Sequence, residues 1–264
     1  MSNITGLFRI PKLSSRVWKV WMRNKDVFMK TYKTNFLPSL LEPVLYLLAL
    51  GFGLGGFVQS INGQSYIQFI APALVAVSMM FSSFYECTFA SFVRMYYQKT
   101  FDAIISTPVN IEEVITGEIL WGATKSLVNS SIVLAVIIVF GVPPSPLFLL
   151  IPLLAFLVGL LFSSIAMCFT GIVPNIDSFN YPNFLFITPM FLLSGTFFPL
   201  TSLPSYIQVA AQLFLPLTNA VTITRSLALV NIQASTFLNL AWILIITPIF
   251  FILAINLMKR RLIK

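Results

Sequence analysis

Leu147–Val173 has the sequence LFLLIPLLAFLVGLLFSSIAMCFTGIV, in which no side chain is charged. A helix rises about 1.5 Å per residue, so roughly 20 apolar residues cross the ~30 Å hydrocarbon core of a bilayer. This stretch is longer than that minimum and predicts a membrane-spanning helix. Similar apolar runs recur on both sides of this stretch. Together they predict a helical protein that crosses the membrane several times.

The composition of the whole chain supports the same conclusion. Of its 264 residues, 58% are hydrophobic and only 9% are charged, and the mean hydropathy is +0.91. Ordinary soluble domains carry about 25% charged residues. The sequence therefore predicts an all-α, polytopic membrane protein and excludes a soluble enzyme.

Six apolar runs predict six transmembrane helices. The predicted spans are Phe36–Phe57, Ile67–Phe92, Val114–Phe140, Leu147–Val173, Asn183–Leu200 and Phe237–Met258. Residues 37–264 are therefore expected to form a single transmembrane domain. Residues 1–36 are expected to form a separate cytoplasmic segment.

Most of the net charge of +8 lies at the two ends of the chain. Residues 1–36 hold eight Lys or Arg residues and one acid, and Lys259–Lys264 holds four more Lys or Arg residues. Basic residues that flank membrane segments are retained on the cytoplasmic side. Both termini are therefore expected in the cytoplasm. Since both basic ends adjoin apolar runs, a membrane surface explains them better than nucleic acid does.

The basic segment before the first span predicts an amphipathic helix over Leu13–Phe36. Aromatic and Met side chains recur there at spacings of three, four or seven residues, and Arg and Lys occupy much of the rest. This pattern is typical of a helix that lies in the cytoplasmic membrane interface. A soluble helix packed on a partner protein is the alternative.

The segment Leu203–Asn231 is apolar but is interrupted by Pro204, Pro216, Asn219 and Arg225. Broken backbone at membrane depth must be shielded by protein or water. The segment therefore predicts a re-entrant helical hairpin that enters from the outer face.

Four ionisable residues lie in or near the predicted spans: Glu42, Glu86, Glu118 and Lys125. Charges at membrane depth are costly and usually have a partner and a function. Glu86 and Lys125 are expected at similar depth on consecutive, oppositely directed helices, so we hypothesise that they pair. A purely structural pair and a role in transport are both open, as is proton coupling through Glu42.

The connection formed by residues 94–113 contains Arg94 and Lys99 and is expected to face the cytoplasm. Its sequence predicts a short helix that ends before Pro108 and carries Phe101, Ile104 and Ile105 on one face. A solvated loop does not need these apolar side chains. They suit a short helix that docks in a groove of another protein.

The sequence offers little for catalysis or cofactor binding. It has no histidine, and its two cysteines, Cys87 and Cys168, match no metal-binding spacing. The motif GxxxxGK[ST], which cradles ATP phosphates, does not occur. No catalytic, cofactor or metal site is therefore predicted in this chain, and any ATPase that drives it must be another chain.

Three stretches together resemble the ABC-2 type permeases, the membrane subunits of bacterial ATP-driven exporters. They are KTFDAIISTPVNIEEVITGEIL (Lys99–Leu120), PMFLLSGTFFPLTSLP (Pro189–Pro204) and LPLTNAVTITRSL (Leu215–Leu227). The resemblance spans essentially the whole chain. Within the family, Ser78–Ile104 is similar to the nodulation-type permeases, which export lipo-chitooligosaccharides.

This resemblance implies a homodimer in the bacterial inner membrane, with two copies of an ATP-binding cassette subunit that hold ATP and Mg²⁺. The substrate it implies is an amphipathic glycolipid or a lipid-linked oligosaccharide or polysaccharide. The implied contacts with the ATPase are Phe101, Asp102, Ile105, Thr107 and Pro108. The implied outer gate consists of Gly195, Phe197, Phe198 and Arg225.

Other functions remain open at this point. Within the same class, the substrate could be a drug or a peptide. An ion-coupled secondary transporter and an intramembrane enzyme are alternatives from other classes. The absence of an internal repeat argues against the first of these, and the absence of histidine argues against the second.

Overall fold

A computed structural model describes residues 9–32, 41, 44–58, 60–61, 63–140 and 146–263. Within these ranges the regular structure is helical, and the one β-type contact is an isolated bridge between Ile61 and Gln64. Glu42 and most of the predicted first span before Val44 lie outside the described residues. The all-α fold class is confirmed for the part of the chain that the structure describes.

Four helices in the described ranges are long and apolar enough to cross a membrane: Tyr66–Tyr97, Ile111–Val139, Pro146–Ile172 and Ala234–Leu262. The first consists of α3 (Tyr66–Tyr85) and the π-helical turns η3 (Glu86–Ala90) and η4 (Val93–Tyr97). The second is α5 (Ile111–Val139), the third joins η5 (Pro146–Leu150) to α6 (Ile151–Ile172), and the fourth is α11 (Ala234–Leu262).

Local sequence explains where two of these helices begin. Ser65 and Gln68 form a reciprocal capping box at the start of α3. At the start of α5, the backbone N–H of Asn110 donates to the Glu113 carboxylate at 2.8 Å. Both arrangements satisfy backbone donors that the first helical turn leaves without partners.

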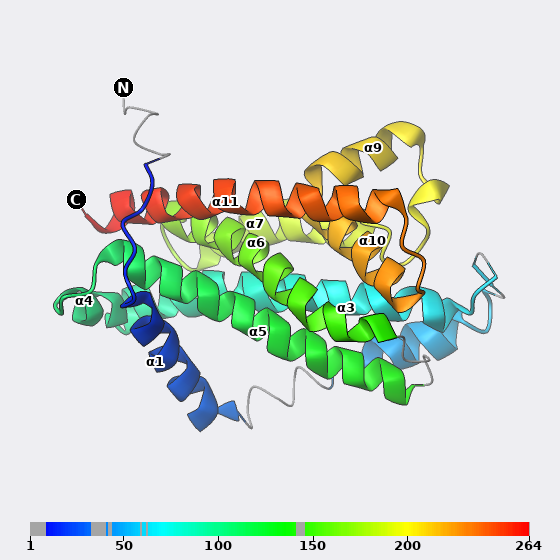
Figure 1. The fold of residues 1–264 in the computed structure, drawn as a ribbon, viewed down its shortest axis with the longest axis horizontal. Coiled ribbons are helices and arrows are strands. Elements are labelled where there is room, and N and C mark those ends of the chain that lie inside the picture. Colours follow the sequence, from blue (N-terminus) through cyan, green and yellow to red (C-terminus); the bar gives the residue numbers. More distant parts are fainter. Residues whose placement is uncertain are drawn as a thin grey trace.

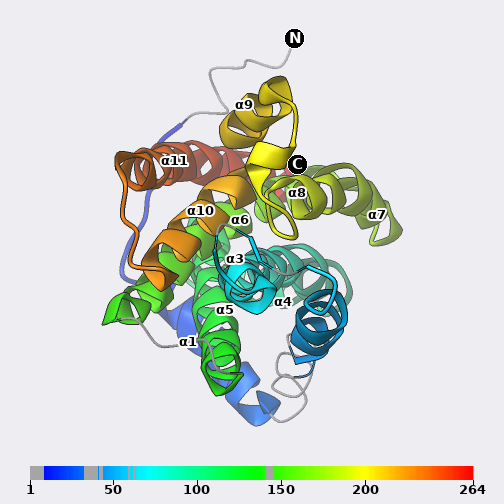
Figure 2. The same cartoon turned by 90° about the vertical axis from the view of Figure 1, so that its right-hand side faces the viewer.

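The membrane helices pack around α3 and α6. Figure 2 looks along the bundle and shows α3 near its centre, with α5, α6 and α10 (Pro216–Ala228) around it. The most apolar window of the α3 span is 72% buried within the chain, whereas that of α11 is 17% buried. The outer face of α11 is therefore left for lipid or for another subunit.

Close approach of α6 to α5 depends on Gly159. A Cβ atom added at Gly159 would lie 2.6 Å from Ser126 Cβ and 2.9 Å from Ala123 Cα. Small residues allow membrane helices to pack at short distance, where van der Waals contact and polar bonds hold them together. The hydroxyl of Ser126 donates to the Ala155 carbonyl at 2.9 Å across the same contact.

The two ends of the bundle differ. At one end lie α1 (Val17–Lys30), α4 (Thr100–Ile105) and the C-terminal end of α11, whereas α9 (Ser205–Phe214) and α10 lie toward the other (Figure 1). An ion pair of 2.5 Å between Lys259 and Glu112 fixes the end of α11 beside the start of α5. We call the end that holds α1, α4 and the C-terminal end of α11 the α4 end of the bundle.

The six predicted spans are only partly seen. Of the first, the described residues include η2 (Leu47–Leu54). The predicted fifth span, Asn183–Leu200, is wrong in its limits. Its place is taken by a helical run of η6 (Asp177–Phe179), α7 (Asn180–Pro182), η7 (Asn183–Ile187) and α8 (Thr188–Leu193).

This run ends because the chain turns at Gly195, whose φ is +72°, a value that suits glycine. Its part from Asn180 to Leu193 is about 20 Å long at 1.5 Å per residue, which is shorter than the hydrocarbon core. The described residues therefore hold four spanning helices, or five if α9 and α10 together form one broken span.

The segment predicted as a re-entrant hairpin does contain two short helices. After the single turn η8 (Leu200–Ser202), α9 and α10 follow each other and meet at an angle of 93°. The bend falls at Leu215–Pro216, where proline suits the first position of a new helix but cannot continue the previous one. How this pair lies relative to a membrane remains a prediction.

The helix predicted over Leu13–Phe36 corresponds to α1, Val17–Lys30. Its apolar side chains lie on two different faces. Val17, Val20 and Asn24 are buried against the bundle, whereas Trp18 is 56% exposed. Met22 and Met29 are also exposed. The helix thus has one face for the bundle and a second apolar face that is free in a single chain.

We expect Gly159→Ala to lower the free energy of unfolding by about 1–3 kcal/mol, because the new methyl group would force α5 and α6 apart. Gly53→Ala is the matched control, since nothing lies within 4 Å of a Cβ at Gly53. Thermal unfolding followed by tryptophan fluorescence in detergent measures both. Equal melting temperatures for the two variants would contradict the close packing.

Candidate functional site

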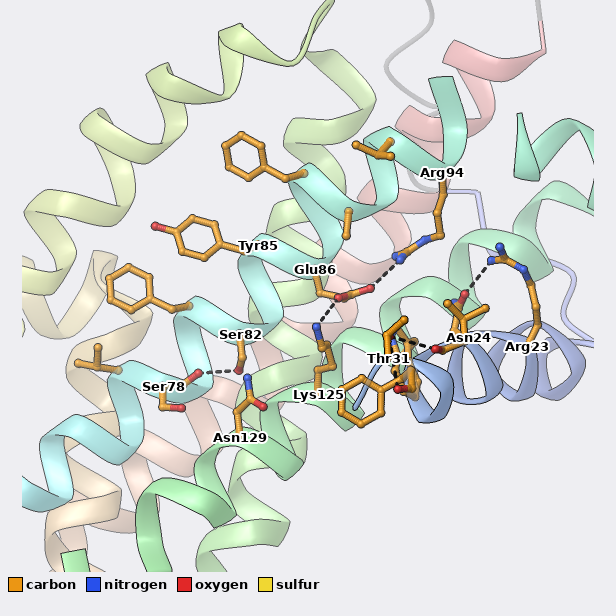
Figure 3. A pocket seen from close by; sticks show the side chains of 18 of the residues that line it. Arg23, Asn24, Thr31, Ser78, Ser82, Tyr85, Glu86, Arg94, Lys125 and Asn129 are labelled. Atoms are coloured by element: carbon orange, nitrogen blue, oxygen red, sulfur yellow. Dashed lines mark hydrogen bonds and ion pairs between the residues drawn. The ribbon is translucent and has the colours of Figure 1, made fainter. Parts of the chain in front are cut away.

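Four charged side chains from two helices form a buried cluster near the α4 end. Arg94 Nη1 lies 2.8 Å from Glu86 Oε1, and Arg94 Nη2 lies 2.6 Å from Glu118 Oε2. Lys125 Nζ lies 3.0 Å from the second oxygen of Glu86 (Figure 3). The predicted Glu86–Lys125 pair is therefore confirmed, and Arg94 and Glu118 extend it to a four-membered cluster.

Glu118 also joins this cluster to α1. Asn24 Nδ2 donates to Glu118 Oε1 at 2.7 Å, and the Ser91 hydroxyl donates to Glu118 Oε2 at 2.7 Å. Arg23 Nη1 in turn donates to Asn24 Oδ1 at 2.9 Å. Because Glu118 is fully buried, these bonds offset the cost of removing its charge from water.

Arg94 was predicted to lie in a cytoplasmic connection, and this prediction is wrong. The helix that starts with α3 continues through η3 and η4 to Tyr97, so Arg94 remains on the helix and faces the bundle. The two π-helical segments change the rotation between Glu86 and Arg94. Such turns are frequent at functional sites, and the apolar periodicity does not reveal them.

Close contact between α1 and α5 brings Asn24 to Glu118. A Cβ at Gly117 would lie 2.6 Å from Val20 Cβ, so only glycine allows the two helices to approach at this point. The indole N–H of Trp21 donates to the Thr124 hydroxyl at 2.9 Å. The ring of Trp121 packs edge-on against Trp21, with ring centroids 6.2 Å apart.

A cavity of about 680 Å³ lies beside the cluster and is partly open. The wall formed by α3 and η3 carries three aromatic rings in succession. Phe81 stacks on Tyr85 with ring centroids 5.5 Å apart, and Tyr85 contacts Phe89 at 5.9 Å. Ser78, Ser82 and Asn129 add polar groups along the same wall and the facing α5, as Figure 3 shows.

This cavity is elongated along α3 and η4. The residues that line it from this side run from Leu74 to Gln98. Arg23, Arg94 and Lys125 line it near α1. We call it the α3 groove: charged at the end near α1 and aromatic along its middle.

The five residues implied as ATPase contacts lie on or after α4 and do not share one surface. Phe101 is fully buried in the core of this chain, so its proposed contact with a partner is wrong for this conformation. Its position anchors α4 to the bundle. Asp102, Ile105, Thr107 and Pro108 are exposed and remain available.

The residues implied as an outer gate lie at the opposite end, and two of the four, Arg225 and Gly195, are linked by a hydrogen bond. Arg225 Nη2 donates to the Gly195 carbonyl at 3.0 Å, and the Arg225 guanidinium lies 3.9 Å from the centre of the Phe69 ring. The Tyr66 hydroxyl donates to the Phe197 carbonyl at 3.2 Å. Phe198 follows in the same loop and is half-buried.

Asn24 and Ser91 contribute to the cluster but were not predicted from the sequence, and Arg23 was not distinguished there from the other cations before the first span. A polar side chain at a buried position of α1 was the available signal for Asn24. Glu42 lies outside the described residues. No group of three His, Cys, Asp or Glu side chains that could hold a metal occurs in the described ranges.

Several apolar membrane helices around a groove that is charged at one end define a membrane transport subunit. The chain belongs to the ABC-2 type transporter family, whose family model matches residues 15–229. Membership in this family implies an ATP-binding cassette partner. Membership is also consistent with a multi-pass protein of the inner membrane that serves as a transport subunit and not as an enzyme.

Individual relatives cover nearly the same length. Nodulation protein J of Sinorhizobium fredii is 35% identical over 247 residues, which is 93% of this chain and 93% of that protein. Nodulation protein J of Rhizobium meliloti is 36% identical over 92% of each chain. The inner membrane transport permease YadH of Escherichia coli is 24% identical over 74% of this chain and 75% of its own.

We expect Glu86→Gln to lower the free energy of unfolding by about 3–5 kcal/mol, because it leaves Lys125 and one side of Arg94 without a carboxylate. The double variant Glu86→Gln/Lys125→Gln restores the charge balance and should recover part of this loss. Melting temperatures of both single variants and the double variant form the required cycle. Strictly additive losses would contradict a coupled cluster.

Proposed function

We propose that this chain is the permease subunit of an ATP-driven exporter that moves an amphipathic glycolipid, or a lipid-linked oligosaccharide or polysaccharide, across the inner membrane. It acts as a homodimer with two copies of a separate ATP-binding cassette subunit. The observation that carries this proposal is the α3 groove, which combines a row of aromatic rings with a charged end.

The lining of the groove supports an amphipathic substrate. Its charged end and its aromatic rings lie along one wall, which runs from Leu74 to Gln98. Aromatic faces such as those of Phe81, Tyr85 and Phe89 contact sugar rings and acyl chains alike, while a few polar groups set orientation. The resemblance of Ser78–Ile104 to the nodulation-type permeases implies the same substrate class.

The groove is partly open in a single chain, and a second copy closes it in our proposal. Substrate then moves between the two copies along α3. The exposed apolar face of α1, with Trp18, Met22 and Met29, rests in the cytoplasmic membrane interface. In this proposed orientation the α4 end and both termini face the cytoplasm, and α9 and α10 form the re-entrant pair at the outer face.

Coupling to ATP hydrolysis runs through α4 and α5. The exposed surface of α4 receives the push of the ATPase, and α5 begins after five intervening residues as one helix of 29 residues. Arg16 donates to the Pro108 carbonyl, and Ser14 donates to the Glu113 carboxylate, so the start of α1 follows the same movement. Glu118 and Lys125 transmit that movement from α5 to the charged end of the groove.

The substrate class is tested in spheroplasts with and without this chain. Cells are labelled with radioactive sugar, and glycolipids on the outer face of the inner membrane are oxidised with periodate, which does not cross the membrane. We expect one glycolipid to leave the accessible pool and accumulate inside when the chain is absent. An unchanged distribution, with altered drug or peptide efflux, would overturn the glycolipid assignment.

We expect Ile105→Asp to reduce recovery of the ATP-binding subunit on affinity purification by at least tenfold, because it places a charge on the exposed apolar surface of α4. Ile263→Asp is the matched control, since Ile263 is a 59% exposed isoleucine on the C-terminal side of α11. Equal recovery with both variants would contradict docking on α4.

Phe101→Ala should act differently from Ile105→Asp. It removes a fully buried ring and should cost about 3–5 kcal/mol of unfolding free energy. Melting temperature separates the two effects: Phe101→Ala lowers it, and Ile105→Asp leaves it unchanged. A stable Phe101→Ala variant that loses the ATPase would restore Phe101 as a direct contact.

A further inference from the structure

The charges around the α3 groove do not balance. Glu86 and Glu118 are the two carboxylates of the cluster, and both oxygens of each are already bonded. They compensate Arg94 and Lys125. Arg23, which also lines the groove, is a third cation without a carboxylate partner among the described residues.

The geometry of Arg23 leaves most of its donors free. A guanidinium carries five N–H donors, and one of them donates to Asn24 Oδ1 at 2.9 Å. Partial burial lowers the pKa of Arg23 from its ordinary value, while Glu118 raises it. The group nevertheless remains charged, since arginine does not lose its proton in proteins.

The free donors lie beside the groove. Arg23, Lys125 and Arg94 line its charged end, where Glu86 is the one carboxylate that the described residues contribute to the lining. Figure 3 shows Arg23, Asn24 and Lys125 around this end, with Tyr85 farther along α3. Lys125 Nζ also lies 5.7 Å from the centre of the Phe28 ring. An anion placed here meets excess positive charge and is next to the row of aromatic rings.

We propose that the charged end of the α3 groove binds an anionic group, a phosphate or sulfate ester, of an amphiphile whose sugar or acyl part lies on Phe81, Tyr85 and Phe89. Arg23 binds the anion through its free N–H donors, and Lys125 adds a second cation. Asn24 positions Arg23 and connects it to Glu118. This proposal rests on the proposed function and narrows its substrate to anionic amphiphiles.

Binding is measured by titration calorimetry with the full chain in phosphatidylcholine nanodiscs, and empty nanodiscs provide the baseline. The probes are decyl phosphate, decyl maltoside, which has the same chain length without charge, and inorganic phosphate. We expect decyl phosphate to bind at least tenfold more tightly than either of the others. Equal binding of decyl maltoside, or of inorganic phosphate, would overturn the proposal.

Arg23→Gln should weaken decyl phosphate binding by about 10- to 100-fold, the range for loss of hydrogen bonds to a charged group. Lys19→Gln is the matched control, because it removes an exposed cation from the same helix. If Arg23→Gln does not fold, the proposal is still tested by comparing the three probes on the unmodified chain. Unchanged affinity in folded Arg23→Gln would overturn the proposal.

A further titration in nanodiscs that contain phosphatidylglycerol separates cargo from membrane lipid. Decyl phosphate should still bind. Complete displacement by phosphatidylglycerol would assign the site to a structural lipid and overturn the substrate assignment. The proposed function is judged separately: if the titrations fail while the glycolipid distribution still depends on this chain, only the anionic-site proposal falls.

Discussion

A charge buried at membrane depth must be compensated within the protein, and this requirement determines the centre of the molecule. Glu118 is fully buried, and breaking a buried ion pair costs several kcal/mol because it leaves a charge without its partner. Arg94, Ser91 and Asn24 supply its partners from two different helices. These bonds connect α1, α5 and the helix that begins with α3.

In the proposed exporter, the same cluster links the ATPase contact to the substrate groove. On one side of it lies α4, whose exposed surface is the proposed contact with the ATP-binding subunit. On the other side lies the α3 groove, whose charged end is made by members of the cluster. A movement of α5 therefore cannot leave the groove unchanged, because Glu118 and Lys125 move with it. This is the physical basis for coupling in the proposed exporter.

The sequence predicted the elements that depend on long apolar runs and on residue depth. The helix around Leu147–Val173 and the Glu86–Lys125 pair are examples, since length and position along consecutive helices are sufficient to place them. The burial of Phe101 and the position of Arg94 on a helix could not be predicted in this way. Periodicity gives the face of a helix but not what covers it, and π-helical turns shift the register without a clear signature.

The most direct test of coupling to an ATPase is affinity purification of the tagged chain from its native membranes in mild detergent, with co-eluting proteins identified by mass spectrometry. We predict an ATP-binding cassette protein with a GxxxxGK[ST] motif, in one-to-one ratio with this chain. A folded chain that elutes without any such ATPase would contradict an ATP-driven exporter and favour ion-coupled transport.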